Sequence, residues 1–246
     1  MDLELADRCA LVTGGSKGLG RAIAHGLAQE GCRRLHLAAR SREALEAVAG
    51  ELSAAYSVAC TLHAVNLVDT GAAEELWSAC RGEVDLLVNN AGAIPGGGLT
   101  EVDSATWRQA WDLKVYGYLD LMRAAYADMA AGHRGVIVNV IGTAGKEVPG
   151  RYVAGVSLDD GVRVVGVSPG DVVNERGTMF LRRQAEDRLG DPERWRDMLA
   201  EQPGGRGVME QDIADAVLFL ASRRAQYISG VTIPVDGGLH ARQRVL

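Results

Sequence analysis

Short apolar runs alternate with helix-like segments along the whole chain, and this alternation constrains the fold more than any other feature. Most runs are continuous stretches of Val, Leu and Ile, which is typical of strands buried on both faces of a parallel sheet. Strands are predicted at residues 9–12, 34–38, 59–65, 85–89, 136–141, 162–167 and 231–235, and helices at 19–30, 42–55, 70–80, 103–129 and 210–221. Thr70 and Asp103 are suitable N-cap residues. We therefore expect an α/β fold with a doubly wound, mostly parallel sheet of seven strands and helices on both faces.

A glycine-rich turn joins the first strand to the first helix. Residues 10–20 read Ala-Leu-Val-Thr-Gly-Gly-Ser-Lys-Gly-Leu-Gly. Such a turn lets the backbone approach a pyrophosphate and directs the first N–H groups of the helix toward it, although glycine-rich turns also occur without a ligand. A side chain at Gly14 or Gly18 would obstruct that approach, because only glycine lacks a Cβ. The residues expected to form the phosphate cradle are Gly14, Ser16, Lys17, Gly18, Leu19 and Gly20.

The composition fits one domain and excludes several classes of partner. The 246 residues are 47% hydrophobic, enough for a substantial core, and we expect a single domain over residues 1–246. The net charge of −6 provides no basic surface for nucleic acid, and no apolar run is long enough to span a membrane. The acidic N-terminus lacks a signal-peptide pattern, so we expect a cytoplasmic protein.

The cysteines predict neither disulfides nor a metal centre. Cys9, Cys32, Cys60 and Cys80 form no Cys-x-x-Cys pair and no clustered Cys/His spacing. We therefore expect buried, reduced thiols and no metal site.

Residues 171–207 form the least regular stretch, a charged helical insert that ends in Pro-Gly-Gly-Arg-Gly. A segment of this length between regular elements is usually functional, often as a lid. Because the insert mixes both signs of charge, it favours neither an anionic nor a cationic ligand.

Further motifs follow the glycine-rich turn in order. Asn-Asn-Ala-Gly at 89–92 comes after the fourth strand and Ser-Pro-Gly at 168–170 after the sixth, and two longer motifs occupy 212–222 and 228–238. Together they resemble the short-chain dehydrogenase/reductase family over nearly the whole chain. The resemblance implies a Rossmann-type fold, a nicotinamide coenzyme and a small-molecule carbonyl or alcohol substrate. It extends the expected coenzyme-binding residues to Asn66, Asn90, Ala91, Gly92, Pro169 and Gly170.

The end of the second strand favours NADP over NAD. An acidic residue there would bind the 2′-hydroxyl of the NAD ribose. This chain has Ala-Ala-Arg at 38–40, and the guanidinium of Arg40 can face a 2′-phosphate. Lys17 adds a second positive charge, although both side chains could also be ordinary solvated surface charges.

The catalytic positions implied by the resemblance depart from the family's Asn, Ser, Tyr and Lys. Lys114 stands at the place of the Asn, Gly142 with Thr143 beside it at the place of the Ser, and Tyr152 is followed four residues later by Val156 rather than Lys. We take Tyr152, Lys114 and Thr143 as the candidate catalytic residues. Lys114 should project inward and polarise a substrate oxygen or a nearby hydroxyl. The alternative is a lysine that reaches solvent or pairs with a carboxylate.

The connection between the fifth and sixth predicted strands is short for the family, which places a long helix here. Only residues 142–161 lie between these strands. We expect a segment of chain to be missing between Ser157 and Leu158, and a true shortening is the alternative.

Two classes of function fit these features. The first is an NADP-dependent oxidoreductase, and the second is a catalytically impaired nucleotide-binding protein that acts as a sensor or subunit. The resemblance also implies a homodimer or homotetramer, formed through the helix at 103–129.

Overall fold

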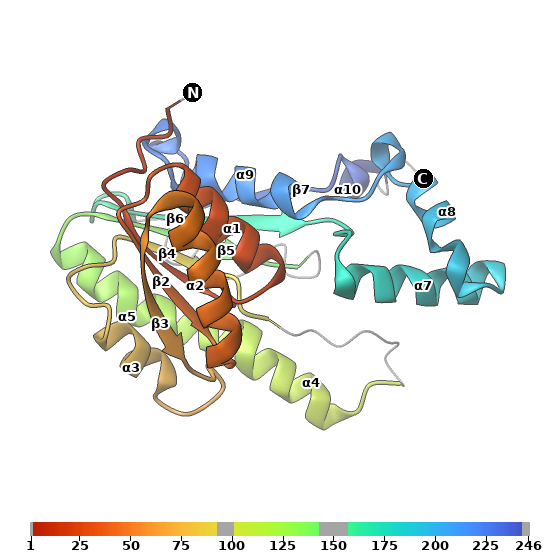
Figure 1. The fold of residues 1–246 in the computed structure, drawn as a ribbon, viewed down its shortest axis with the longest axis horizontal. Coiled ribbons are helices and arrows are strands. Elements are labelled where there is room, and N and C mark those ends of the chain that lie inside the picture. The colour runs from red at the N-terminus through yellow and green to blue at the C-terminus, as the bar shows by residue number, and fades with distance from the viewer. Residues whose placement is uncertain (1, 93–100, 143–156, 243–246) are drawn as a thin grey trace.

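The computed structural model describes residues 2–92, 101–142 and 157–242. Seven strands within these ranges form one parallel sheet in the order β3-β2-β1-β4-β5-β6-β7 (Figure 1). Their bounds are β1 Cys9–Thr13, β2 Arg34–Ala39, β3 Ala59–Ala64, β4 Leu86–Asn89, β5 Gly135–Val140, β6 Val162–Pro169 and β7 Thr232–Val235. The fold predicted from the sequence is confirmed.

The central strands are buried along their whole length, as their continuous apolar sequences require. In the register, Val12 of β1 lies opposite Leu37 of β2 on one side and Val88 of β4 on the other. The sheet order reverses between β1 and β4, and all strands are parallel, so the carboxyl ends of β1, β2, β4 and β5 meet at one edge. Ligands of open α/β sheets bind in the crevice at such a reversal.

Helices cover both faces of the sheet. One face carries α1 (Gly18–Gln29), α2 (Arg42–Tyr56) and α9 (Glu210–Ala221), and the other carries α3 (Ala72–Ser78) and α5 (Gly117–Ala131) (Figure 1). The two layers bury separate apolar clusters. Fully buried members of the first include Ile23, Leu45 and Val217, and members of the second include Trp77 and Leu121. Each such side chain stabilises the fold by about 1.5–3 kcal/mol relative to exposure.

The helix predicted at 103–129 is interrupted. It consists of α4 (Ser104–Trp111), a π-helical turn η1 (Asp112–Tyr116) and α5. Asp103 caps α4 as predicted, because its side chain accepts a hydrogen bond of 2.8 Å from the N–H of Thr106. The spacing of apolar residues gives no sign of a single π turn, which adds one residue and occurs frequently at functional sites.

The predicted cap of α3 at Thr70 is wrong. The helix begins after Gly71, whose φ of 80° lies in the left-handed region. Glycine adopts this conformation without the steric cost that a threonine would meet there.

The insert at 171–207 forms a small helical lobe beside the sheet (Figure 1). Its helices are α7 (Glu175–Leu189) and α8 (Trp195–Ala200), with 3-10 turns at Pro192–Arg194 and Pro203–Gly205. The lobe has its own buried cluster of Leu181, Ala185, Trp195 and Met198. After α9 the chain adds a 3-10 turn at Arg223–Ala225, then β7 and α10 (Leu239–Arg242).

The gap expected between Ser157 and Leu158 is absent. Turn hydrogen bonds span this point: the N–H of Asp160 donates to the carbonyl of Ser157 over 3.2 Å, and that of Gly161 donates to Leu158 over 3.0 Å. The positive φ of Gly161 then turns the chain directly into β6. In the structure the chain thus passes directly from Ser157 through this turn into β6, and the expectation of additional residues in the natural protein stays a prediction.

The four cysteines are free thiols, of which Cys9, Cys32 and Cys80 are buried. Burial raises the pKa of Cys32 and of Cys80 to about 12 in each case, which keeps these thiols protonated at neutral pH. Among the described helices, none combines the length and apolar character that crossing a membrane requires.

Candidate active site

The glycine-rich turn leaves the N-terminus of α1 open. Gly14 and Gly18 have φ values of 67° and 56°, so both occupy the left-handed region. The first N–H groups of an α-helix have no acceptor within the helix. At α1 the N-cap residue, Lys17, provides no side-chain hydrogen bond to them. This uncapped end of a helix attracts an anion such as a pyrophosphate.

Gly20 lets the helix pack closely against the turn. A Cβ added at Gly20 would lie 2.2 Å from the carbonyl oxygen of Gly14 and 2.6 Å from Nδ2 of Asn90. A Cβ added at Gly14 would also meet Asn90 Nδ2, at 2.8 Å. The packing of Gly14, Gly20 and Asn90 thus leaves no room for a side chain at either glycine.

Asn90 fastens the end of β4 to the glycine-rich turn. Its Nδ2 donates to the carbonyl of Thr13 over 2.9 Å. The hydroxyl of Thr13 in turn accepts hydrogen bonds from the N–H groups of Asn90 (2.9 Å) and Ala91 (3.0 Å). The family resemblance implies that Asn90 contacts a ribose; in the structure its amide N–H group holds the turn.

Two exposed cations lie beside the cradle. Arg40 directly follows β2, and Lys17 directly precedes α1. Within the described part of the chain, neither side chain has an ion-pair partner. The two backbone segments are adjacent, because the N–H of Gly14 donates to the carbonyl of Ala38 over 2.7 Å. Both cations are thus free to bind an added phosphate near the end of β2.

The remaining residues of the predicted coenzyme site lie at the carboxyl ends of other strands. Asn66 follows β3 and donates to Asp69 over 2.9 Å. Pro169 ends β6, and a Cβ at the following Gly170 would lie 2.8 Å from Cβ of Asp236. Gly92 lies two residues beyond Asn90 and contacts Lys114, the next part of the site.

Lys114 projects inward from η1 to the ends of β4 and β5. Its Nζ donates to the carbonyl of Val140 over 2.6 Å and to the hydroxyl of Tyr118 over 2.7 Å. The Tyr118 hydroxyl itself donates to Val140 over 3.1 Å. A Cβ at Gly92 would lie 3.0 Å from the Lys114 Nζ. The Lys114 side chain therefore points inward, as predicted. Its hydrogen bonds go to neutral oxygens rather than to a carboxylate.

This environment changes the acidity of the amine. Burial, with a smaller contribution from the positive charge of Arg176, lowers the pKa of Lys114 from 10.5 to about 7. Burial raises the pKa of Tyr118, so its hydroxyl stays protonated. An amine with a pKa near 7 can both donate and accept a proton at neutral pH. Tyr118 is not among the residues predicted from the sequence, although its spacing of four from Lys114 places both on one helix face.

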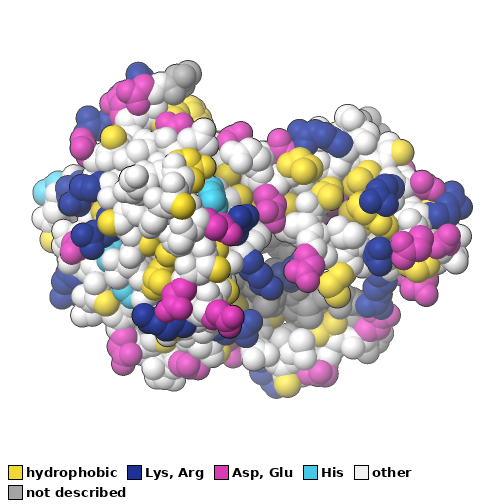
Figure 2. All heavy atoms as spheres, viewed as in Figure 1, with side chains coloured by type: hydrophobic (Ala, Val, Ile, Leu, Met, Phe, Trp, Pro, Cys, Tyr) yellow, Lys and Arg dark blue, Asp and Glu magenta, His cyan; other side chains and the backbone are white. Residues whose placement is uncertain are grey.

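The insert reaches the same site from the opposite side. Arg176 of α7 donates to the carbonyl of Gly92 over 3.4 Å. Asn174, the N-cap of α7, donates to Glu210 over 3.1 Å, and the Glu210 carboxylate lies near the position a Cβ at Gly18 would occupy. Figure 2 shows the molecule hollowed between the sheet and the lobe, with cationic and anionic side chains intermingled on that face. Thr143 and Tyr152, the other candidate catalytic residues, lie outside the described residues.

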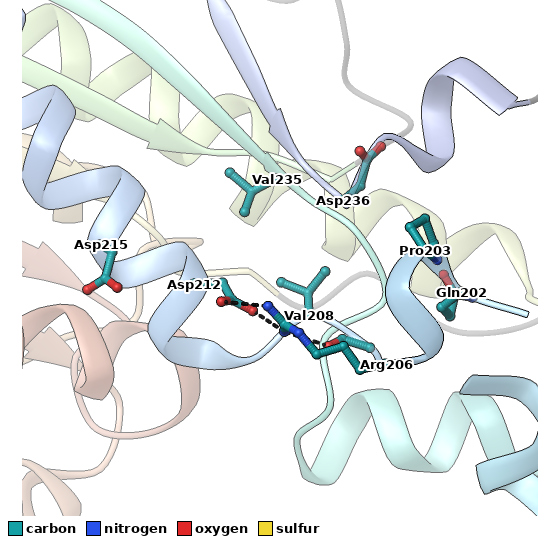
Figure 3. A pocket seen from close by; sticks show the side chains of 10 residues that line it. Gln202, Pro203, Arg206, Val208, Asp212, Asp215, Val235 and Asp236 are labelled. Atoms are coloured by element: carbon teal, nitrogen blue, oxygen red, sulfur yellow. Dashed lines mark hydrogen bonds and ion pairs between the residues drawn. The ribbon is translucent and has the colours of Figure 1, made fainter. Parts of the chain in front are cut away.

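A separate cleft of about 400 Å³ lies at the end of β7, between α9 and the last part of the insert (Figure 3). Its most prominent charges are paired, because Arg206 donates to Asp212 over 2.6 and 3.1 Å. None of the predicted site residues is among its lining residues. The cradle and Lys114, rather than this cleft, therefore form the candidate active site.

Known proteins share this architecture. The family model for short chain dehydrogenase matches residues 8–156. The 3-oxoacyl-[acyl-carrier-protein] reductase FabG of Staphylococcus aureus (strain Mu50 / ATCC 700699) is 33% identical over 246 residues, covering 95% of this chain and 98% of that protein. The crystal structure of L-sorbose reductase from Gluconobacter frateurii, complexed with NADPH and L-sorbose, is 26% identical with a TM-score of 0.86 and covers 97% of this chain and 98% of its own. NAD+-bound xylitol dehydrogenase is 24% identical with a TM-score of 0.87, covers 96% and 100%, and shares the fold alone. The chain therefore belongs to the short chain dehydrogenase family of oxidoreductases.

Proposed function

We propose that the protein is an NADP-dependent oxidoreductase acting on a carbonyl or alcohol of a small molecule. The uncapped N-terminus of α1, packed against the turn with no room for a side chain at Gly14 or Gly20, carries this proposal. Gly14, Ser16, Gly18, Leu19 and Gly20 present backbone to the pyrophosphate, and Asn90 keeps that backbone in place. When bound, the coenzyme supplies or accepts the hydride, and the protein supplies orientation and a proton.

In this proposal Lys114 handles the proton at the candidate active site. Its Nζ lies between the ends of β4 and β5, and its pKa of about 7 suits general acid–base catalysis at neutral pH. Tyr152 and Thr143 remain candidates for orienting the substrate oxygen. The insert would act as a lid, since Arg176 already contacts the backbone at Gly92.

A coenzyme titration followed by a substrate panel tests the proposal. NADPH should bind, and its absorbance should fall when a suitable carbonyl compound is added. Binding without turnover over a wide panel would instead favour the nucleotide-binding sensor or subunit. The predicted replacement of the family's Asn by Lys114 keeps this second function open.

We expect tighter binding of NADP(H) than of NAD(H), because Arg40 and Lys17 are exposed cations beside the end of β2. Arg40→Ala should reduce that preference by about 1–3 kcal/mol, the scale of a charge-assisted hydrogen bond. Isothermal titration with both coenzymes measures the change. Arg42→Ala is the matched control, since Arg42 is an exposed neighbour already paired with Glu46 at 3.0 Å. Equal affinities of the parent protein for the two coenzymes would contradict the proposal.

We further propose that the protein forms a homodimer or homotetramer through α4 and η1. Trp111 at the end of α4 and Tyr116 at the end of η1 are 56% and 57% exposed. Aromatic side chains are enriched in protein interfaces. Trp111→Glu should weaken self-association by at least about 30-fold, the effect of a typical hot-spot residue. Light scattering at micromolar concentration measures the mass, with Met179→Glu on the insert as the control. A monomeric parent protein would exclude this assembly.

A further inference from the structure

Three potential metal ligands from separate elements converge at the edge of the sheet. They are His36 of β2, His63 of the edge strand β3, and Cys80, which follows α3. The Nδ1 of His36 lies 2.9 Å from the Nε2 of His63. The Cys80 Sγ lies 3.4 Å from the first nitrogen and 3.8 Å from the second. None of these side chains belongs to the coenzyme site or to the candidate catalytic residues.

Two of these three distances fit a tetrahedral zinc ion. Zinc lies about 2.0–2.1 Å from a histidine nitrogen and about 2.3 Å from a thiolate, which sets its ligand atoms about 3.3–3.8 Å apart. The two distances from sulfur to nitrogen fall in that range. The distance of 2.9 Å between the histidine nitrogens is the one that must widen, by a few tenths of an ångström. His63 is partly exposed and can rotate to allow this.

The second nitrogen of His36 provides independent support. His36 is only 2% exposed, and its Nε2 has no hydrogen-bond partner among the described residues. The Glu83 carboxylate lies 3.5 Å away, just beyond hydrogen-bonding distance. Metal-bound histidines usually donate the other ring N–H to a carboxylate, a backbone carbonyl or a water molecule. Coordination through Nδ1 would place the proton of His36 on Nε2, where it faces Glu83.

We propose that His36, His63 and Cys80 bind one zinc ion, with water in the fourth position. Cysteine and imidazole together suit zinc among the common divalent metals. Cys80 binds as the thiolate, and its proton passes to solvent when the metal enters past the partly exposed His63. Since the three ligands come from β2, β3 and the end of α3, the ion ties the edge strand and this helix to the sheet. No metal site is predicted from the sequence, because the ligands are far apart in the chain and only the register of β2 and β3 brings the histidines together.

The charged groups facing the cluster are Glu83, which lies near His36 Nε2, and Arg34, which lies 3.8 Å from Glu83. The opposite charges of these two groups cancel, so the charge around the cluster does not repel a divalent cation.

The test uses the full chain, purified under reducing conditions and treated with a chelator. One equivalent of zinc should bind, as measured by metal analysis and competition with a chromophoric chelator. Saturation at about a hundredfold excess over the dissociation constant should raise Tm by about 5–10 °C. Cobalt(II) should give the visible bands of a tetrahedral site and a thiolate charge-transfer band.

Variants distinguish this site from surface binding. Cys80→Ser should abolish the charge-transfer band, and the partly exposed His63→Gln should weaken metal binding by at least about 100-fold. Glu83→Gln should weaken it by about tenfold, the usual effect of a partner of a metal ligand. Cys60→Ser is the matched control, because Cys60 lies on β3 but packs on the opposite face of the sheet.

Circular dichroism of each chelated variant establishes that it is folded before metal is added. Equal zinc affinity in the parent protein, Cys80→Ser and His63→Gln would overturn the proposal. Cobalt spectra without a thiolate band in the parent protein would overturn it as well. Because the site is separate from the coenzyme cradle, coenzyme binding is expected with or without the metal.

Discussion

Replacing Lys114 by methionine should lower kcat by about 10²–10⁴-fold, the usual contribution of a general acid or base. The substitution removes the amine that lies between the ends of β4 and β5 but keeps the aliphatic stem. Because the amine donates to Val140 and Tyr118, and methionine keeps an aliphatic stem beside Gly92, the affinity for NADPH should change by less than about threefold. Steady-state kinetics on a substrate identified by the panel, together with a coenzyme titration, separate the two effects.

The pH profile shows whether the amine itself titrates. In the parent protein, kcat/KM should change with an apparent pKa near the value of about 7 for Lys114. Lys114→Arg keeps a cation that stays protonated at every accessible pH. It should remove this ionisation from the profile. An unchanged profile in Lys114→Arg, or unchanged kcat in Lys114→Met, would eliminate Lys114 as the proton-transferring group.

The same lysine should destabilise the folded protein in a pH-dependent way. Its pKa is lower in the folded chain than in the unfolded one, so between about pH 7 and pH 10.5 the unfolded chain binds more protons and the stability of the parent rises with pH. Below about pH 7 both states are protonated, and the cost of burying the charge is largest. Lys114→Met should therefore raise the free energy of unfolding by about 1–3 kcal/mol at about pH 6. This gain should shrink toward about pH 10, and urea denaturation at the two pH values measures it.

The sequence predicts the strands of this protein well and its side-chain clusters poorly. The predicted bounds of all seven strands agree with the structure to within two residues. For β1, β4, β5 and β6, burial on both faces leaves little freedom in composition, whereas the edge strands β3 and β7 are only partly buried. The π-helical turn at Asp112–Tyr116 is invisible in the apolar spacing, yet it lies in the segment that carries Lys114. The inward direction of Lys114 follows from its family position, whereas its shifted pKa depends on Val140 and Tyr118, which only the folded structure brings near.

The cluster of His36, His63 and Cys80 also cannot be predicted from the sequence, because only the folded structure brings these residues together. A metal-binding motif is readable when its ligands lie close together in one loop or helix. Here the parallel register of β2 and β3 and the packing of α3 bring distant residues together. The phosphate cradle is the opposite case, since all of its glycines lie within one strand–turn–helix unit and can be read directly.

Gly20→Ala should abolish most coenzyme binding and destabilise the fold by about 2–4 kcal/mol. Gly20 lies inside α1 with an ordinary helical backbone, so conformational freedom is not the reason for glycine there. The reason is space: the new Cβ would lie 2.2 Å from the carbonyl oxygen of Gly14 and 2.6 Å from Nδ2 of Asn90. Either the turn or the Asn90 amide must move, and both hold the backbone of the phosphate cradle. NADPH affinity should fall by at least about 100-fold, an effect typical of a binding-site displacement of about 1 Å.

Gly50→Ala is the matched control, because Gly50 also lies inside a helix and a Cβ there would meet nothing within 4 Å. In an exposed helix interior, alanine is more favourable than glycine by about 0.5–1 kcal/mol, so this variant should be slightly more stable than the parent and bind NADPH equally well. Replacing glycine by alanine is thus expected to lower the stability at position 20 and to raise it at position 50. The difference between the two variants measures the effect of the close contact with Gly14 and Asn90. Urea denaturation gives both stabilities, and fluorescence titration gives both affinities. If Gly20→Ala matched Gly50→Ala in stability and NADPH affinity, the close packing of α1 against the turn could not be what forms the cradle.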